Sequence, residues 1–278
     1  TIRRRLPFEE GTVYLELRFA PAFSAHDGFT QKDVVGAVRD GLKKAEADLG
    51  MRTGILLCGM RHFDLEKNLE IPALAEKFMG DGVCGIDLAG DEKAYPPELH
   101  SKMFSLASEM EIPFTIHAGE CHSAENVRTS VLMGARRIGH GIAMAGVKEI
   151  EELCRERGVA VEMCPTSNFQ TKAVGEEKRL PESDVSWNRG WPFTVNTDNR
   201  TVSGTSMTEE LFLLHSQFGV TKDEALRMTE NAVLAAFAEE EVKRELLEKL
   251  ADFRKNQDSR MEDRHRKTQR GESGWRFI

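Results

Sequence analysis

Short apolar stretches alternate seven times with stretches of helical period, and this alternation limits the possible folds more than any other feature of the chain. The apolar stretches are short and rich in aliphatic residues, which is typical of buried strands. Alternation at this spacing predicts βα units and therefore a parallel sheet. The predicted strands cover about residues 13–21, 53–60, 83–90, 113–118, 136–141, 159–164 and 191–198.

The helical stretches carry their own start and stop signals. Thr30 begins a helix with an acid three residues further on, and Gly50 ends it. Pro72 is expected to divide the second helix into two pieces, and Thr221 opens another capping box. A polar loop is predicted over residues 167–186. The predicted helices cover about residues 30–49, 65–78, 97–110, 124–133, 147–158, 208–218, 221–237 and 239–254.

Polar or reactive residues end nearly every predicted strand. The carboxyl ends of parallel strands meet on one face, so this pattern favours an α/β fold of the (β/α)8 TIM-barrel type with its site on that face. A doubly wound open sheet is the competing fold, but its ligand sits at one switch point. A closed barrel needs an eighth strand, and the sequence predicts only seven. We predict one barrel domain over residues 1–254, including C-terminal helices, and a charged tail over 255–278 that is frayed or an exposed helix.

Charge and cysteine content narrow the possible partners. The chain of 278 residues has a net charge of −8, which disfavours nucleic acid and anionic membranes as partners. No apolar run reaches the roughly 18 residues of a membrane span, and no signal peptide is visible. Five scattered cysteines without a CxxC pair fit a reducing compartment, so a cytoplasmic location is expected. The chain does not begin with Met, which suggests a trimmed or incomplete N-terminus.

His117 and Asp198 end two predicted strands and form a plausible zinc pair. A catalytic zinc needs at least three protein ligands, and the sequence contains no HxH pair. His117 could equally be a histidine at the edge of the core that bonds a neighbour. The sequence around Asp198 could by itself be a turn rich in Asn and Asp.

Two further side chains at strand ends suit acid–base chemistry. Glu120 could act as a general acid if burial raises its pKa, or it could simply interact with a helix N-terminus. His140 lies between Gly139 and Gly141, which favours a general base with an exposed ring over a histidine in a turn. Gly90 could let a ligand approach the backbone, or could simply end its strand.

The chain contains six ordered motifs, which are Met60-Arg61-His62, Asp87-Leu88-Ala89-Gly90-Asp91-Glu92, His117-Ala118-Gly119-Glu120, Gly139-His140-Gly141, Cys164-Pro165-Thr166-Ser167-Asn168 and Asn196-Thr197-Asp198-Asn199-Arg200. Taken together, these motifs resemble the adenosine deaminase family of zinc aminohydrolases. The resemblance covers most of residues 13–249. The family places an HxH pair on its first barrel strand, and this sequence has no counterpart to it, so the resemblance implies that the first strand is missing.

The resemblance implies a role for each matched residue. His117 and Asp198 would bind zinc, Glu120 would protonate the purine at N1, and His140 would act on the metal-bound water. Gly90 would meet the purine through its backbone, and Asn199 would donate to N7 where the family often has an aspartate.

The resemblance also implies hydrolytic deamination of adenosine and 2′-deoxyadenosine. Two alternatives stay open: a catalytically impaired remnant that binds nucleoside or a protein partner, and a deaminase of another aminopurine. The oligomeric state cannot be read from the sequence.

Overall fold

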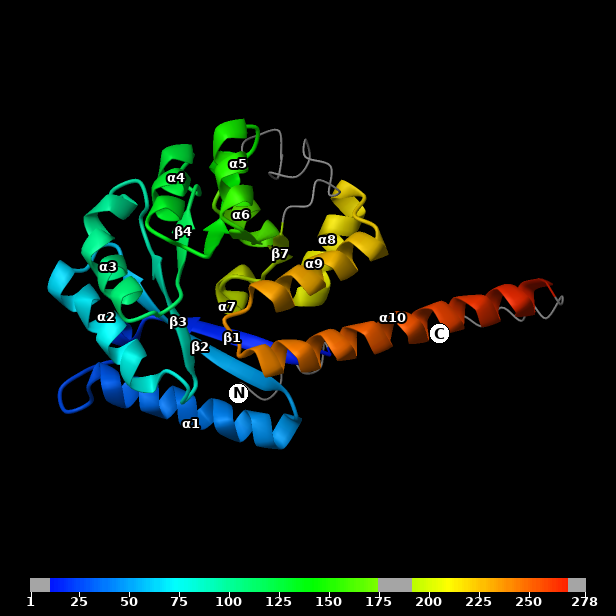
Figure 1. The fold of residues 1–278 in the computed structure, drawn as a ribbon, viewed down its shortest axis with the longest axis horizontal. Helices are drawn as coiled ribbons and strands as arrows, with labels where there is room; N and C mark the ends of the chain where they lie inside the picture. Colours follow the sequence, from blue (N-terminus) through cyan, green and yellow to red (C-terminus); the bar gives the residue numbers. More distant parts are fainter. Residues whose placement is uncertain (1–10, 175–191, 270–278) are drawn as a thin grey trace. The chain divides into compact units, whose positions relative to one another are not determined.

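The structure is a computed structural model that describes residues 11–174 and 192–269, with side chains up to residue 256. It confirms the predicted alternation of strands and helices (Figure 1). The strands are β1 (Tyr14–Phe19), β2 (Arg52–Met60), β3 (Val83–Ala89), β4 (Thr115–Ala118), β5 (Arg137–His140), β6 (Ala160–Met163) and β7 (Phe193–Val195). The α-helices are α1 (Gln31–Leu49), α2 (Leu65–Phe78), α3 (Ser101–Glu109), α4 (Ala124–Leu132), α5 (Lys148–Glu156), α6 (Pro165–Gln170), α7 (Arg200–Ser203), α8 (Met207–Phe218), α9 (Lys222–Ala235) and α10 (Glu240–Gln269).

The strands pair in sequence order, and every ladder is parallel. Strands β1, β2 and β3 form one sheet, and β4 to β7 form a second. A single parallel bridge between Ile86 and Phe114 joins β3 to the segment that leads into β4. In the described residues, β1 and β7 are therefore the outer strands of this seven-strand order. The α/β class is confirmed, and closure into a barrel stays a prediction.

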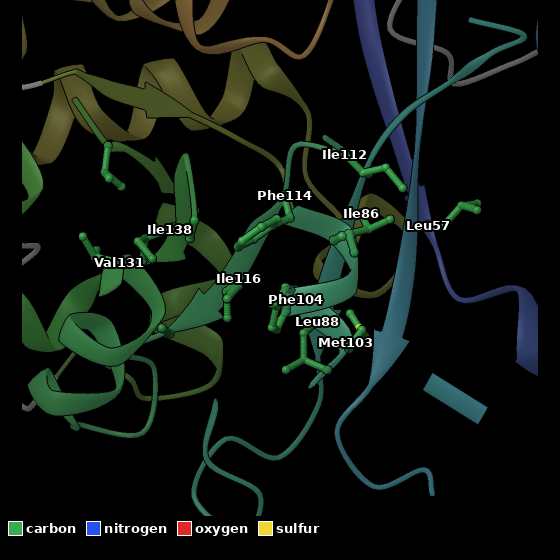
Figure 2. Close-up of a cluster of buried hydrophobic side chains, with 14 of the residues drawn as sticks. Leu57, Ile86, Leu88, Met103, Phe104, Ile112, Phe114, Ile116, Val131 and Ile138 are labelled. Carbon is green, nitrogen blue, oxygen red and sulfur yellow. The ribbon is translucent and has the colours of Figure 1, made fainter. Parts of the chain in front are cut away.

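The core lies between the strands and the inner faces of the helices that follow them. Figure 2 shows Met103 and Phe104 of α3 and Val131 of α4 packed against side chains from the strands. The rings of Phe104 and Phe114 lie 4.8 Å apart. This packing fixes the direction of each strand, and so the position of the residue that ends it.

Helix α2 departs from the prediction, because it is continuous through Pro72. Proline removes a backbone hydrogen bond, but tertiary contacts compensate for this loss here. The Asn68 side chain accepts from the Met60 N–H at 3.0 Å and donates to the Met60 carbonyl at 2.9 Å, which ties the helix to β2. Pro72 itself is buried with Ile71 and Ala75.

Other helix ends follow their sequence signals, with one further correction. The capping boxes at Thr30 and Thr221 are present, and Gly50 adopts a left-handed conformation at the end of α1. The start of the predicted 167–186 loop was wrong, because α6 extends to Gln170; Pro165 at its first turn favours the helix. The rest of that loop after residue 174 lies outside the described residues.

The chain divides into two compact units, one ending at Ala238 and the other beginning at Glu239. The second unit contains α10, which extends to Gln269, beyond the predicted helix end at residue 254. Ion pairs between neighbouring turns, such as Lys249 with Glu245 at 2.8 Å, support this polar helix. The predicted domain boundary at residue 254 stays a prediction.

None of the helices in the described part of the chain has the length and apolar character needed to cross a bilayer. All five cysteines are free.

Candidate active site

The six residues predicted for the site all lie at or just beyond the carboxyl ends of strands. They come from four strand ends, and four of them form one cluster of imidazoles and carboxylates. Gly90 follows β3, His117 lies within β4, Glu120 follows β4, His140 ends β5, and Asp198 and Asn199 follow β7.

His117 is oriented by an acid from the neighbouring strand. Its Nδ1 lies 2.9 Å from Oδ2 of Asp87, a fully buried residue of β3. Burial alone would lower the pKa of His117, but the Asp87 carboxylate raises it above its ordinary value. With Nδ1–H donating to Asp87, the ring presents Nε2 to a ligand, which is the arrangement typical of metal-binding histidines.

Glu120 and His140 form the acid–base pair of the cluster. Oε2 of Glu120 lies 3.6 Å from Nε2 of His140. On the other side of the ring, Nδ1 of His140 donates to Oδ1 of Asn168 at 2.7 Å, and both residues are buried. This bond fixes the neutral tautomer with its lone pair on Nε2, so that His140 can accept a proton on the side of Glu120.

Asp198 lies close enough to both imidazoles for their charges to affect its pKa. Burial would raise that pKa, but the Ser167 hydroxyl, which donates to Oδ2 at 2.7 Å, and the two imidazoles lower it. The lowered pKa favours the ionised form of the Asp198 carboxylate. Its backbone φ of 50° lies in the left-handed region, which is uncommon outside glycine and occurs at functional turns.

An imidazole Nε2 and an ionised carboxylate are suitable zinc donors, so His117 and Asp198 fit two positions of a zinc centre. They do not complete it. No group of three or more His, Cys, Asp or Glu side chains suited to a metal occurs in the described residues. The residues present thus fit zinc in kind, and further ligands are required.

Gly90 and Asn199 occupy separate positions on the same edge. Gly90 has a φ of 114°, a backbone conformation that essentially only glycine adopts. This conformation explains why a glycine occupies the position. Oδ1 of Asn199 accepts from the Val202 N–H at 3.1 Å and caps α7. That bond uses the side-chain oxygen and leaves the amide N–H groups as the donors for a ligand.

The sequence reasoning missed the side chains that hold the cluster in place. Asp87, Ser167 and Asn168 were quoted in motifs without a role. Arg18 of β1 was not identified at all, although its Nη1 lies 3.1 Å from Asp87 and its Nη2 donates to Glu162 at 2.6 Å. Polar or charged residues within otherwise apolar strands were the available signal, because such groups are buried only when paired.

Parallel strands that end in two imidazoles and two carboxylates define an α/β enzyme with acid–base chemistry at one edge of its sheet. The chain belongs to the adenosine deaminase family, whose sequence model, described as adenosine deaminase, matches residues 5–253. This match confirms the resemblance that the six motifs predicted.

Similar proteins cover most of the chain. It is 41% identical to an adenosine deaminase of Enterococcus faecalis over 242 residues, which are 87% of this chain and 72% of that protein. An adenosine deaminase of Clostridium acetobutylicum is 41% identical over 243 residues, with the same coverage of 87% and 72%. Among solved structures, an Arabidopsis N6-mAMP deaminase is 28% identical with a TM-score of 0.79, covering 87% of this chain and 74% of that one.

Proposed function

We propose that this chain catalyses the hydrolytic deamination of adenosine and 2′-deoxyadenosine to the corresponding inosines and ammonia. The observation that carries the proposal is the pairing of Glu120 with His140 at 3.6 Å, beside His117 and Asp198. An acid and a base on adjacent strand ends are the groups that hydrolysis of an aminopurine requires. Family membership and the two adenosine deaminases at 41% identity support the substrate class.

The proposed mechanism assigns one proton transfer to each member of the Glu120–His140 pair. Nε2 of His140 takes a proton from the attacking water, while the bond to Asn168 holds the ring in the required tautomer. Glu120, acting as the acid, gives a proton to the ring nitrogen N1, which makes the carbon that carries the amino group more electrophilic, so that water adds there. His140 then passes the proton it took from the water to the amino group, the C–N bond breaks and ammonia leaves. The added hydroxyl returns a proton to Glu120, so both side chains regain their starting state. The backbone at Gly90 and the amide of Asn199 bind and orient the purine.

Zinc is the proposed cofactor, one ion per chain, with His117 and Asp198 as two of its ligands. When bound, zinc supplies the Lewis acidity that activates the water. The HxH pair typical of the family would provide the remaining ligands. The same strand would lie between β1 and β7 and close the (β/α)8 barrel. We propose one deaminase domain over residues 1–254, consistent with a family match that ends at residue 253, with a tail over 255–278. The free cysteines favour a cytoplasmic location.

Two alternatives have a specific observation in their favour. The likeness to an Arabidopsis N6-mAMP deaminase favours another aminopurine, such as a nucleotide or an N6-substituted base. The presence of only two zinc donors in the described cluster favours a remnant that binds nucleoside or a protein partner without turnover.

A substrate panel separates these functions. The purified protein is supplied with zinc, and ammonia release is measured from adenosine, 2′-deoxyadenosine, adenine, AMP and N6-methyl-AMP. The proposal predicts the highest kcat/KM for the two nucleosides. A preference for a nucleotide or a free base would assign the second function. Nucleoside binding by calorimetry without ammonia release from any substrate would assign the third.

A further inference from the structure

Glu92 is a buried carboxylate that the mechanism above does not use. It is 5% exposed and lies two residues after Gly90, in the connection between β3 and α3. Each of its two oxygens accepts two hydrogen bonds, so four donors surround one carboxylate. The donors are the backbone N–H groups of Gly119 at 2.7 Å, Glu120 at 2.9 Å and Cys121 at 3.1 Å, and the side-chain amide of Asn126 at 2.9 Å.

The backbone that Glu92 binds is the turn that carries Glu120. Arg61, another buried charged residue, donates to the His117 carbonyl at 2.6 Å, so the turn is held at both ends. The turn is also tight, because Gly119 has a φ of 86° and a Cβ at that position would lie 2.8 Å from Val127. The Glu120 side chain therefore projects from a backbone segment that side chains from two other loops hold in place.

Charge explains why an acid occupies this position. Three consecutive N–H groups point toward one site, and a carboxylate is the side chain that can accept from all of them without offering a donor. Burying a charged group is costly unless its hydrogen bonds are satisfied, and here both oxygens are saturated. The resulting charge-assisted bonds are stronger than neutral ones, so the turn is held more rigidly than packing alone would hold it.

We propose that Glu92 is a positioning residue that fixes the 119–121 backbone and thereby sets the Glu120 carboxylate against His140. The inference rests on the proposed function, because it assigns Glu92 a role in the same proton transfer. Glu92 itself does not reach the reacting atoms. Its effect passes through Glu120, and misplacing a catalytic group by about 1 Å can cost on the order of 100-fold in rate.

Two substitutions separate the charge from the size of the side chain. Glu92→Gln keeps the shape but places an NH2 group against two N–H donors, whichever way the amide is turned. Glu92→Asp keeps the four acceptor sites but shortens the side chain by one methylene. We expect kcat for adenosine to fall about 100-fold in Glu92→Gln and about 10-fold in Glu92→Asp, with KM changed by less than about 3-fold in both. Glu98→Gln, which changes an exposed acid in the same connection, is the matched control and should keep kcat unchanged.

A double substitution tests whether Glu92 acts through Glu120. If it does, adding Glu92→Gln to Glu120→Gln lowers kcat by less than about 3-fold, because the group being positioned is already lost. If the same 100-fold loss appears in both backgrounds, Glu92 has a general structural role and the proposal is wrong. Melting curves of all variants identify loss of folding, and Glu92→Asp provides the comparison if Glu92→Gln does not fold.

Amide hydrogen exchange gives a readout that does not depend on turnover. Peptides that cover residues 117–123 should exchange at least about 10-fold faster in Glu92→Gln than in the unsubstituted protein, while the rest of the chain is unchanged. Unchanged exchange in this segment would overturn the proposal even if activity fell. If the unsubstituted protein has no deaminase activity, the proposed function fails and the positioning of Glu120 for proton transfer fails with it, whereas the exchange result still shows whether Glu92 holds the turn.

Discussion

Replacement of Asn168 by Leu tests the assignment of His140 as the base. Oδ1 of Asn168 accepts from Nδ1 of His140 at 2.7 Å, and the two residues are 0% and 2% exposed. Leucine has the same branched shape but no acceptor, so a buried Nδ1–H loses its partner. Leaving a buried donor unpaired costs about 1–3 kcal/mol. The ring can avoid this cost by moving its proton from Nδ1 to Nε2. A protonated Nε2 can no longer accept a proton from water.

We therefore expect kcat to fall between about 5- and 150-fold, which is the same 1–3 kcal/mol expressed as a rate. KM should change little, because the substitution removes no predicted contact with the purine. Nitrogen NMR of labelled histidine reports the tautomer directly, and the lone pair should move from Nε2 to Nδ1. Gln170→Ala on the same helix, whose side chain donates to Ser203 at 2.9 Å, is the control. An unchanged tautomer with an unchanged kcat in Asn168→Leu would contradict the assignment of His140 as the base held by Asn168.

Two predictions concern stability. Burial and then the charge of Arg61 lower the pKa of His100 from 6.5 to about 4, so the unfolded chain takes up this proton first and stability falls as the pH drops from about 6.5 to 4. The free energy of unfolding should fall by at most about 3 kcal/mol over this range. Urea unfolding at each pH measures this loss. A His100→Gln variant whose stability has the same pH dependence would contradict the prediction. Arg137 lies 2.8 Å from Glu16 and 2.7 Å from Glu162, so Arg137→Met should cost about 3–5 kcal/mol by removing the buried cation that these two acids share. The exposed Arg128 is the control, and Arg128→Met should cost less than about 1 kcal/mol; equal losses in the two variants would contradict the prediction.

The order of the elements could be predicted from the sequence because it depends on local patterns. Apolar runs, the capping residue Thr30 and the terminating Gly50 act within a few residues of chain. The predicted break of α2 at Pro72 was wrong for a reason that is not local. The continuity of α2 through Pro72 depends on the contact of Asn68 with Met60, which lies on another element. No local propensity contains that information.

The residues of the candidate site also divide into those that local sequence predicts and those whose contacts depend on tertiary packing. His117, Glu120 and His140 could be identified because strand ends concentrate chemistry in a parallel α/β fold. The partners of these residues could not, because Asp87 meets His117 and Asn168 meets His140 only after the strands have aligned. A carboxylate or amide in a motif indicates that a polar group is needed there, but its partner is decided by packing.

The role of Glu120 as the proton donor is tested by the kcat of Glu120→Gln in zinc-loaded protein, with zinc measured in the same samples. Glutamine keeps the size of the side chain but cannot give up a proton as an acid can. We expect kcat for adenosine to fall by at least about 100-fold, which is the usual contribution of a positioned acid, while zinc per chain is unchanged. A variant that turns over adenosine within a few-fold of the unsubstituted protein would contradict the role of Glu120 as the proton donor.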